Sequence, residues 1–165
     1  MGIFVSNTPG KNSIAVAELT IGLLISIDRY IPDNVADLRN GKWNKKKYSE
    51  TLGLFGRNIG IIGLGAIGMN VAERCHGLGM NIFAVDPYAE KFVRVPWIML
   101  KKSLNELTEI CDIFTFHVPA LPETKGIINA AFLSKVKPNS IIINTSRGDV
   151  QNDADLLKAL DEKNI

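Results

Sequence analysis

The chain has little cysteine, little histidine and no long apolar run. Its 165 residues include two cysteines and two histidines. Cys75 and Cys111 lie in apolar periodic segments, where a free thiol behaves as a small hydrophobic group, so we expect neither to be a metal ligand or a nucleophile. No stretch reaches the ~18 apolar residues that a membrane span needs, and no basic region followed by a long apolar stretch opens the chain. We therefore expect a cytoplasmic protein without a metal site or membrane contact.

The chain also lacks a strong charge of either sign. Lysine and arginine total 19, aspartate and glutamate 17, and the net charge is +2. The one basic cluster, residues 45–47 beside Lys42, lies next to Trp43 and Tyr48 without further aromatic interleaving. This pattern is typical of a solvated face rather than of a nucleic-acid site. With 46% hydrophobic and 22% charged residues, the chain should fold as one domain or as one piece of a larger one.

The N-terminal part predicts an interface helix and a linking segment. Residues 13–27 carry apolar side chains on more than one side of a helix. A helix of this kind is buried between two bodies, so it should pack against another domain or subunit. A second short helix is expected to end near Arg39, before Asn40 and Gly41, and residues 43–57 are expected to be a connecting stretch. Residues 1–57 are thus expected to be a linking segment with the interface helix, and residues 58–165 a separate core.

From Asn58 onward, short β-rich runs alternate with helical segments. We expect strands at residues 59–62, 81–85, 113–117 and 140–144, and helices at residues 67–78, 104–110, 130–136 and 153–161. This alternation implies crossover units, and hence a parallel sheet with helices on both faces. The predicted fold class is α/β, a Rossmann-type doubly wound parallel sheet that is incomplete at its C-terminus.

A glycine loop directly follows the first strand. Gly63, Gly65 and Gly68 fit the pattern G-x-G-x-x-G and lead into a helix, the context that makes this pattern informative. Gly63 permits the tight turn, Gly65 lets the backbone approach a pyrophosphate, and Gly68 lets the helix pack closely on the strand. The amides at Ala66 and Ile67 should then point at the phosphates. The sequence therefore predicts a dinucleotide site.

Asp86 ends the next strand, 21 residues after Gly65. A carboxylate at about this offset hydrogen-bonds the hydroxyls of the adenosine ribose, and it repels a 2′-phosphate. Pro87 and Tyr88 follow it, where an NADP site usually has a basic residue. The expected cofactor is NAD.

Three polar segments follow strands at the carboxyl edge of the sheet, where such folds bind ligands. They are residues 117–119, 122–125 and 144–149. Arg147, in the last segment, could hold an α-keto acid, since its planar guanidinium pairs a carboxylate bidentately and its charge polarises a carbonyl. An ordinary surface arginine in a turn explains the spacing equally well.

The motifs occur in a familiar order along nearly the whole chain. NTPGKNSIAVAELT, NIGIIGLGAIG, VDPY, DIFTFHVPALPETKGIIN and IIINTSRGDV together resemble the cofactor domain of the D-isomer-specific 2-hydroxyacid dehydrogenases. The similarity is strongest to the branch of phosphoglycerate dehydrogenase and hydroxypyruvate or glyoxylate reductase. It implies an oxidoreductase that transfers a hydride between NAD(H) and a small D-2-hydroxy acid or 2-keto acid.

The resemblance also implies roles for individual residues. Arg147 takes the place of the arginine that binds the substrate carboxylate and carbonyl, and it adjoins the cofactor; Asn7 resembles a residue near the substrate. The resemblance implies three further groups of cofactor-binding positions. Thr20 reaches the cofactor from the linking helix, and Thr145 and Ser146 lie along the nicotinamide half. The adenosine and phosphate region is bordered by His117, Val118, Pro119 and Thr124.

Two parts of the family pattern do not occur in these 165 residues. Family members use a histidine as general acid/base and a glutamate that orients it. The histidine lies in a segment that reads roughly T-P-H, and the glutamate in one that reads roughly D-V-F-x-x-E-P. In addition, a separate domain of ~100 residues supplies half the substrate cleft in these proteins. His76 and His117 are not expected to replace the proton donor. We therefore expect the chain as given to bind NAD and to turn over little or nothing.

Two other functions were considered. A non-catalytic module of corepressor type would use NAD to stabilise a dimer or a partner surface, and the apolar helix at residues 13–27 favours this. In family members that helix helps to form a homodimer with the cofactor domain. A short-chain dehydrogenase is set aside, because no tyrosine has a lysine four residues later.

Overall fold

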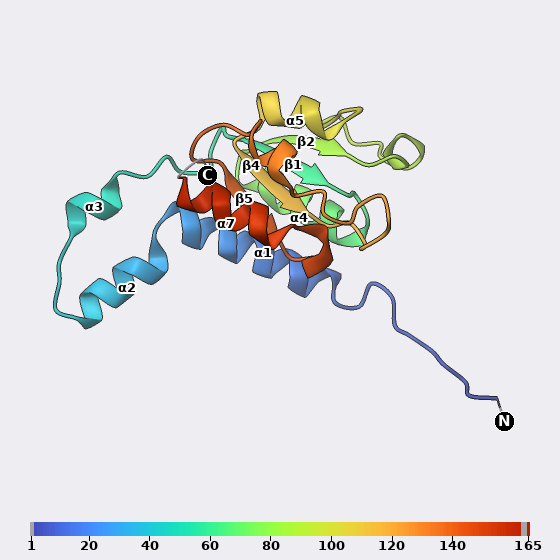
Figure 1. Ribbon diagram of the computed structural model, residues 1–165, viewed down its shortest axis with the longest axis horizontal. Helices are drawn as coiled ribbons and strands as arrows, with labels where there is room; N and C mark the ends of the chain where they lie inside the picture. Colours follow the sequence, from blue (N-terminus) through green and yellow to red (C-terminus); the bar gives the residue numbers. More distant parts are fainter. Residues whose placement is uncertain (1, 163–164) are drawn as a thin grey trace.

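The computed structural model describes residues 2–162 and residue 165. Its centre is a sheet of parallel strands (Figure 1). The strands are β1 (Asn58–Ile62), β2 (Asn81–Val85), β3 (Ile98–Leu100), β4 (Ile113–Phe116) and β5 (Ile141–Asn144). The α-helices are α1 (Ser13–Asp28), α2 (Ile31–Arg39), α3 (Lys45–Ser49), α4 (Ala66–Gly77), α5 (Leu104–Ile110), α6 (Ala130–Leu133) and α7 (Asp153–Asp161).

The strand order is β3-β2-β1-β4-β5. Each neighbouring pair is parallel, with Ile61 opposite Ala84 on one side and Thr115 on the other. The chain winds from β1 outward to β3, then returns to the other side of β1 with β4. This reversal separates the loops that follow β1 and β4, and open α/β sheets bind their ligands in the crevice at such a switch point.

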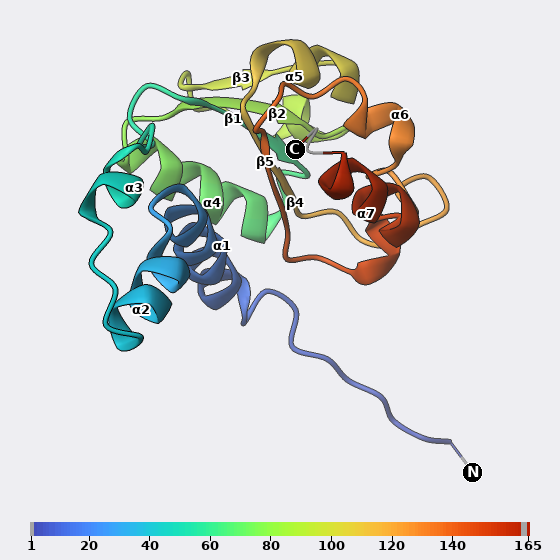
Figure 2. The same cartoon turned by 60° about the vertical axis from the view of Figure 1, so that its left-hand side comes forward.

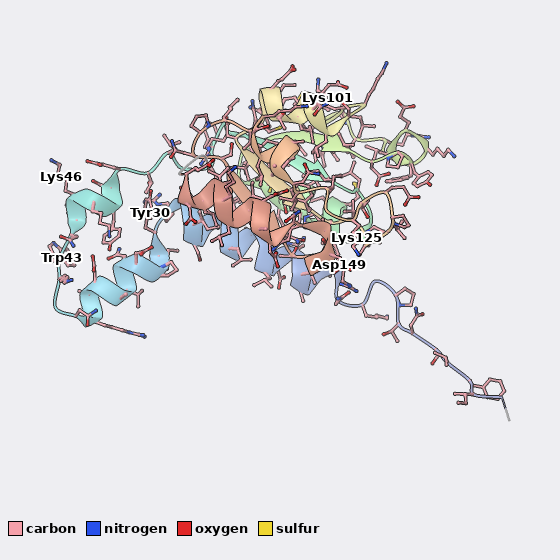
Figure 3. The ribbon with its side chains drawn as sticks, in the orientation of Figure 1. Tyr30, Trp43, Lys46, Lys101, Lys125 and Asp149 are labelled. Atoms are coloured by element: carbon pink, nitrogen blue, oxygen red, sulfur yellow. The ribbon has the colours of Figure 1, made fainter. Side chains whose placement is uncertain are left out.

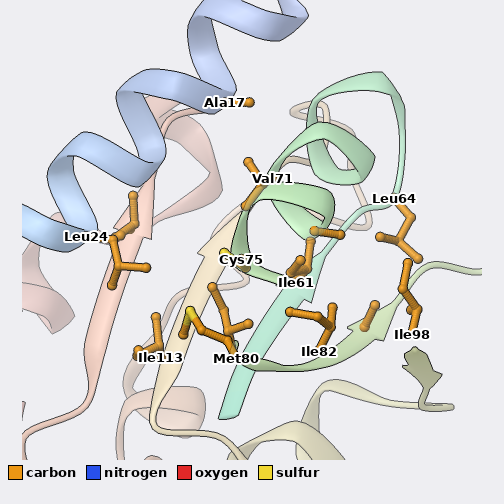
Figure 4. Packing of buried hydrophobic residues seen from close by; sticks show 14 of the residues in the cluster. Ala17, Leu24, Ile61, Leu64, Val71, Cys75, Met80, Ile82, Ile98 and Ile113 are labelled. Carbon is orange, nitrogen blue, oxygen red and sulfur yellow. The ribbon is translucent and has the colours of Figure 1, made fainter. Parts of the chain in front are cut away.

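Helices cover both faces of the sheet, which confirms the predicted fold class. α1 and α4 lie on one face, while α5, α6 and α7 lie on the other (Figure 2). The central strands are consequently apolar at consecutive positions, and every residue of β4 is buried. One hydrophobic cluster joins β1 to α1 and α4 through residues such as Ala17, Leu24 and Val71 (Figure 4). A second cluster lies between the sheet and α5, α6 and α7 around Phe114, Phe116 and Phe132.

α1 packs against the core through one stripe only. The stripe recurs every three or four residues, as a helix requires, and consists of Ser13, Ala17, Thr20, Leu24 and Asp28. The apolar side chains of Ile14, Leu19, Leu23 and Ile27 are exposed. The expected second apolar face of this helix is therefore present, and nothing in the described chain covers it.

The predicted elements differ from the observed ones in three places. α3 lies within residues 43–57, which were expected to be a simple connection, and it forms with α2 an arm that carries Trp43 and Lys46 away from the sheet (Figure 3). β3 was missed because it has three residues and buries only Ile98 fully. α6 ends at Leu133 rather than near residue 136, since the N–H of Lys135 donates to the carbonyl of Phe132, three residues back, and so closes a tight turn instead of another α-helical turn.

Candidate functional site

The bend after β1 requires glycine at Gly63. Its φ of +93° lies in the region that L side chains avoid, and a Cβ there would lie 2.8 Å from the carbonyl oxygen of His117. The backbone at the end of β1 thus nearly touches the backbone at the end of β4. The site begins where these two strand ends meet.

The other two glycines have different surroundings. A Cβ on Gly68 would overlap the carbonyl oxygen of Gly63, whereas a Cβ on Gly65 would meet nothing within 4 Å. Gly68 was predicted to let the helix pack closely on the strand; its Cβ would meet the carbonyl of Gly63, directly after β1, and would lie 3.5 Å from the side chain of Ile61 in β1. Gly65 instead faces open space, which leaves room for a ligand against the backbone.

The N-terminus of α4 offers free backbone donors. No side chain caps the helix, and Gly65 and Ala66 are exposed. The first amides of a helix have no partner within it, and the helix dipole adds partial positive charge there. The amides at Ala66 and Ile67 can therefore hold an anionic group, so this chain's own backbone fits a dinucleotide pyrophosphate.

Asp86 is fixed at the end of β2 by two backbone donors. Its Oδ2 accepts from the N–H of Leu64 at 2.8 Å, and its Oδ1 accepts from the N–H of Tyr88 at 2.8 Å. A cavity of about 370 Å³ opens beside it, lined by Val85, Asp86, Pro87, Glu90, Leu100, Lys101 and Lys102. The carboxylate keeps acceptor capacity toward this cavity, as a ribose site requires. Lys101 and Lys102 in the wall of this cavity were not predicted, because they lie outside the glycine motif and its acidic partner.

A second cavity of about 360 Å³ lies between α1 and the ends of β4 and β5. It brings together seven of the predicted residues: Ile67, His117, Val118, Pro119, Thr145, Ser146 and Arg147. Asn12, Val16 and Ala120 complete its wall. Val16 and Ala120 were missed because small apolar side chains carry no chemical signal of their own, and Asn12 was missed because its place beside the ends of β4 and β5 depends on how α1 packs.

Asn144 organises the turn that presents Arg147. Its side-chain oxygen accepts from the backbone N–H of Ser146 at 3.0 Å and from the Ser146 hydroxyl at 2.6 Å. Its side-chain amide donates to the carbonyl of Arg147 at 3.0 Å and to Oε1 of Gln151 at 3.1 Å. Asn144 and Gln151 thus hold the turn from both sides, a role that the sequence interpretation did not give them.

Arg147 is exposed at the rim of this cavity. Its Nη1 donates to the carbonyl of Ser146 at 2.9 Å, and within the described residues no carboxylate lies at ion-pair distance from it. Its remaining guanidinium N–H groups are available to an incoming carboxylate. The geometry suits bidentate recognition.

His117 lies in the wall of the same cavity with its ring largely covered. Burial lowers its pKa to about 4, because a low-dielectric environment disfavours the charged imidazolium. Its Nε2 contacts the hydroxyl of Thr115 at 2.9 Å. Near pH 7 the ring is neutral, and that nitrogen faces the protein rather than the open cavity.

Apart from the glycine loop and Asp86, three predicted site residues lie outside this cavity. Asn7 belongs to an exposed segment that runs away from the sheet (Figure 1). Thr20 is 1% exposed, and its hydroxyl contacts that of Thr145 at 3.0 Å, behind the cavity wall. Thr124 donates to the carbonyl of Pro119 and accepts from the N–H of Leu121 at 2.9 Å, so it shapes the loop after β4.

The loops after β4 and β5 are joined at their outer ends. Gly126 donates to the carbonyl of Asp149 at 2.8 Å, where the side chains of Lys125 and Asp149 emerge (Figure 3). Ile128 and Gln151 extend this contact as a parallel bridge. The segment with His117 and the segment with Arg147 are therefore held in one piece.

Two kinds of feature do not occur among the described residues. No helix there combines the length and apolar character needed to cross a bilayer. No group of three or more histidine, cysteine, aspartate and glutamate side chains is arranged to hold a metal ion in the same part of the chain.

Comparison with known proteins identifies the family. Residues 21–165 match the model described as D-isomer specific 2-hydroxyacid dehydrogenase, NAD binding domain. The D-3-phosphoglycerate dehydrogenase of Methanocaldococcus jannaschii is 41% identical over 165 residues, which cover 99% of this chain and 31% of the relative. The enzyme of the same name from Rattus norvegicus is 38% identical, covering 96% of this chain and 30% of the relative.

A solved structure agrees with these relatives. The NAD-dependent formate dehydrogenase of Staphylococcus aureus, in complex with NAD, superposes with a TM-score of 0.87 at 29% identity, covering 95% of this chain and 46% of that chain. The chain thus spans about a third of the length of the curated relatives it matches. It belongs to the D-isomer specific 2-hydroxyacid dehydrogenases and comprises the NAD-binding domain of that family.

Proposed function

We propose that this chain is the cofactor-binding part of an oxidoreductase that transfers a hydride between NAD(H) and a small D-2-hydroxy acid or 2-keto acid. The observation that carries the proposal is Arg147, which stands without a carboxylate partner among the described residues on the rim of a cavity that also contains Ile67 and Thr145. A guanidinium so placed can bind a substrate carboxylate beside the cofactor.

Each end of the cofactor has a proposed support. The amides at Ala66 and Ile67 hold the pyrophosphate, and Asp86 accepts hydrogen bonds from the adenosine ribose. Thr145 and Ser146 border the nicotinamide half, and His117, expected at the adenosine and phosphate region, is assigned to the nicotinamide half as well because it lines the same cavity as these two residues. When bound, NAD supplies the hydride acceptor; Arg147 orients the substrate carboxylate and polarises the reacting carbonyl.

The proton that accompanies the hydride needs a separate donor. His76 is exposed on α4, where its ring stacks on Trp97 at 4.4 Å, and the Nε2 of His117 is engaged by Thr115. Neither histidine has a nitrogen free at the rim beside Arg147. We therefore propose that these 165 residues bind NAD but turn over little, and that the proton donor and the substrate domain come from other parts of the protein.

Calorimetric titration of the chain with NAD tests the cofactor proposal, since binding is expected and its absence would refute the proposal. A second titration adds glyoxylate, hydroxypyruvate or phosphohydroxypyruvate to the chain saturated with NAD. Arg147→Lys should weaken keto-acid binding by about tenfold or more, because lysine loses the bidentate geometry. Arg39→Lys, at the end of α2, is the matched control. NADH consumption at a rate typical of an intact dehydrogenase would contradict the proposed lack of a proton donor.

A second function rests on α1. Ile14, Leu19, Leu23 and Ile27 form an exposed apolar face, and monomeric proteins seldom leave such faces uncovered. The chain could therefore serve as an NAD-dependent dimerisation or protein-binding module. Sedimentation with and without NAD distinguishes the two: a dimer that strengthens with NAD favours this function, and a monomer indifferent to NAD counts against it.

A further inference from the structure

A row of hydrogen-bonding side chains runs from α1 to the middle of the sheet, behind the wall of the cavity. Thr20 donates its hydroxyl proton to the carbonyl of Val16 at 2.9 Å, and its oxygen lies 3.0 Å from the hydroxyl of Thr145. The Thr145 oxygen is 3.5 Å from Nδ1 of His117. On the far side of the ring, Nε2 is 2.9 Å from the hydroxyl of Thr115.

The first bond fixes the direction of all the others. A carbonyl can only accept, so the single proton of Thr20 goes to Val16 and Thr20 must accept from Thr145. Thr145 has then used its own proton and presents a lone pair to the ring. Nδ1 of His117 must carry a proton to face that lone pair, even across the long 3.5 Å separation.

A neutral imidazole carries only one proton. Since burial lowers the pKa of His117 to about 4, the ring is neutral near pH 7, and Nε2 is left as an acceptor. Thr115 supplies the matching donor, and within the described residues its hydroxyl has no other hydrogen-bond partner. Each hydrogen bond in the row, from Thr115 to Val16, therefore has one donor and one acceptor.

Only two members of this row reach the cavity. His117 and Thr145 line it, whereas Thr115 is fully buried in β4 and Thr20 is 1% exposed. Thr115 and Thr20 can influence a ligand only through the two residues between them. Each anchors the wall from a different element, the sheet in one case and α1 in the other.

We propose that Thr115 is a positioning residue: its hydroxyl fixes the Nδ1–H tautomer of His117, and the ring in turn orients Thr145 for the nicotinamide half of NAD. This inference rests on the proposed function for its cofactor part. Without the Thr115 hydroxyl, Nε2 loses its donor, and the Nδ1–H tautomer is then held only by the long 3.5 Å contact to Thr145. The proton can then move to Nε2, Thr145 turns its own proton toward Nδ1, and the bond from Thr145 to Thr20 is lost.

Histidine-selective ¹⁵N labelling tests the tautomer directly. The chain has two histidines, His76 and His117. His76 is exposed, so its ring signals serve as an internal reference for those of His117. In the unaltered chain near pH 7, Nδ1 of His117 should have the shift of a protonated nitrogen and Nε2 that of an unprotonated one. Thr115→Val should move the proton to Nε2 or give a mixture, whereas Thr115→Ser should keep the original pattern.

NAD titration of the same proteins tests the consequence. Thr115→Val should weaken NAD binding roughly three- to tenfold, as expected for one lost hydrogen bond, and Thr115→Ser should restore it. Thr108→Val is the matched control: Thr108 is also a buried threonine, but its hydroxyl bonds Asn105 within α5 at 2.7 Å. This control should change neither the histidine spectrum nor the affinity.

Three results would overturn the inference. The first is a protonated Nε2 of His117 in the unaltered chain. The second is a histidine spectrum of Thr115→Val that is identical to the spectrum of the unaltered chain. The third is a loss of NAD affinity in Thr115→Val that Thr108→Val reproduces. Failure of the proposed function has a different signature, because the unaltered chain would then take up no NAD while its histidine spectrum stayed readable.

Discussion

The backbone N–H of Leu64 donates to Oδ2 of Asp86 at 2.8 Å. Leu64 lies inside the glycine bend after β1, and Asp86 follows the neighbouring parallel strand β2. One hydrogen bond therefore links the segment proposed to hold the pyrophosphate with the carboxylate proposed to hold the ribose. The distance between these two ends of the site is fixed by the protein before any ligand arrives, which reduces the ordering cost of binding.

Asp86→Asn should weaken NAD binding by about ten- to a hundredfold. An asparagine side chain has one carbonyl oxygen, so it cannot accept from both Leu64 and Tyr88 and still bind the ribose, and hydrogen bonds to a charged acceptor contribute about 1.5–3 kcal/mol. NADP binding should fall less, because the variant no longer repels the 2′-phosphate. Parallel titrations with both dinucleotides measure the difference. Asp161→Asn, at the end of α7, is the control, and unchanged NAD affinity in Asp86→Asn would contradict the assignment.

Gly68→Ala should destabilise the fold, whereas Gly77→Ala in the same helix should not. A Cβ on Gly68 overlaps the carbonyl oxygen of Gly63, and a Cβ on Gly77 meets nothing within 4 Å. Overpacking of this kind costs about 1–3 kcal/mol, while alanine in an open helical position contributes up to about 1 kcal/mol of stability relative to glycine. Urea unfolding of both variants measures the contrast. Equal stability of the two would show that α4 can shift away from the loop without cost.

The elements that the sequence predicted are those with strong local patterns. β1, β2 and β4 are near-continuous apolar runs, and α4, α5 and α7 begin and end within one residue of expectation. The three strands bury most of their residues and the helices bury only the positions that face the sheet, so burial and periodicity agree. The glycine loop was equally readable, because a positive φ at Gly63 and the close packing at Gly68 leave no other residue suitable.

The parts that could not be predicted depend on tertiary contacts. β3 is a strand because Ile82 and Ala84 of β2 present their backbone to it, and a three-residue segment has no period of its own. Gln151 belongs to none of the motifs, yet its side chain accepts from Asn144 and supports the arginine turn. Such roles arise only when distant residues meet.

The placement of Thr20 makes the same point. Its position in the linking helix led us to expect contact with the cofactor, and that contact stays a prediction. In the structure its hydroxyl reaches Val16 and Thr145 instead. A sequence pattern identifies which helix faces the site, but the direction of a single hydroxyl depends on partners 125 residues away.

Arg57→Met should destabilise the protein more than the double variant Asp28→Leu with Arg57→Met. Nη1 of Arg57 lies 2.9 Å from Oδ1 of Asp28, and the two side chains are 13% and 3% exposed. The other oxygen, Oδ2 of Asp28, is buried and has no hydrogen-bond partner among the described residues. Removing the arginine leaves a buried uncompensated carboxylate, which costs about 3–5 kcal/mol, whereas apolar replacement of both partners is often close to neutral.

A double-mutant cycle in urea measures this coupling. Glu18→Gln is the control, because Glu18 is 65% exposed and lies 3.8 Å from Nη2 of Arg74, and such surface pairs contribute at most about 1 kcal/mol. A double variant less stable than Arg57→Met alone would contradict the prediction. It would mean that the site needs the polar pair to hold the end of α1 against the start of β1.

The stability of the chain should fall between pH 6.5 and pH 4 because of His117. Burial lowers the pKa of its ring from 6.5 to about 4 in the folded protein. In this window the unfolded chain binds a proton that the folded chain does not, so the stabilising contribution is complete above pH 6.5 and is lost as the pH falls toward 4. A shift of this size corresponds to about 3 kcal/mol. Asp37, whose pKa is lowered below 3.8 chiefly by the hydrogen bond from Tyr48, loses its contribution only at more acidic pH.

Urea unfolding at a series of pH values checks this, and the two histidines provide a matched pair. His117→Gln should flatten the dependence between pH 6.5 and 4 whatever its effect on absolute stability, since the titrating group is gone. His76→Gln should leave the dependence intact, because that ring is exposed. A slope that persists in His117→Gln would assign the acid sensitivity to carboxylates, and it would remove the reason to regard the His117 ring as held neutral behind the cavity wall.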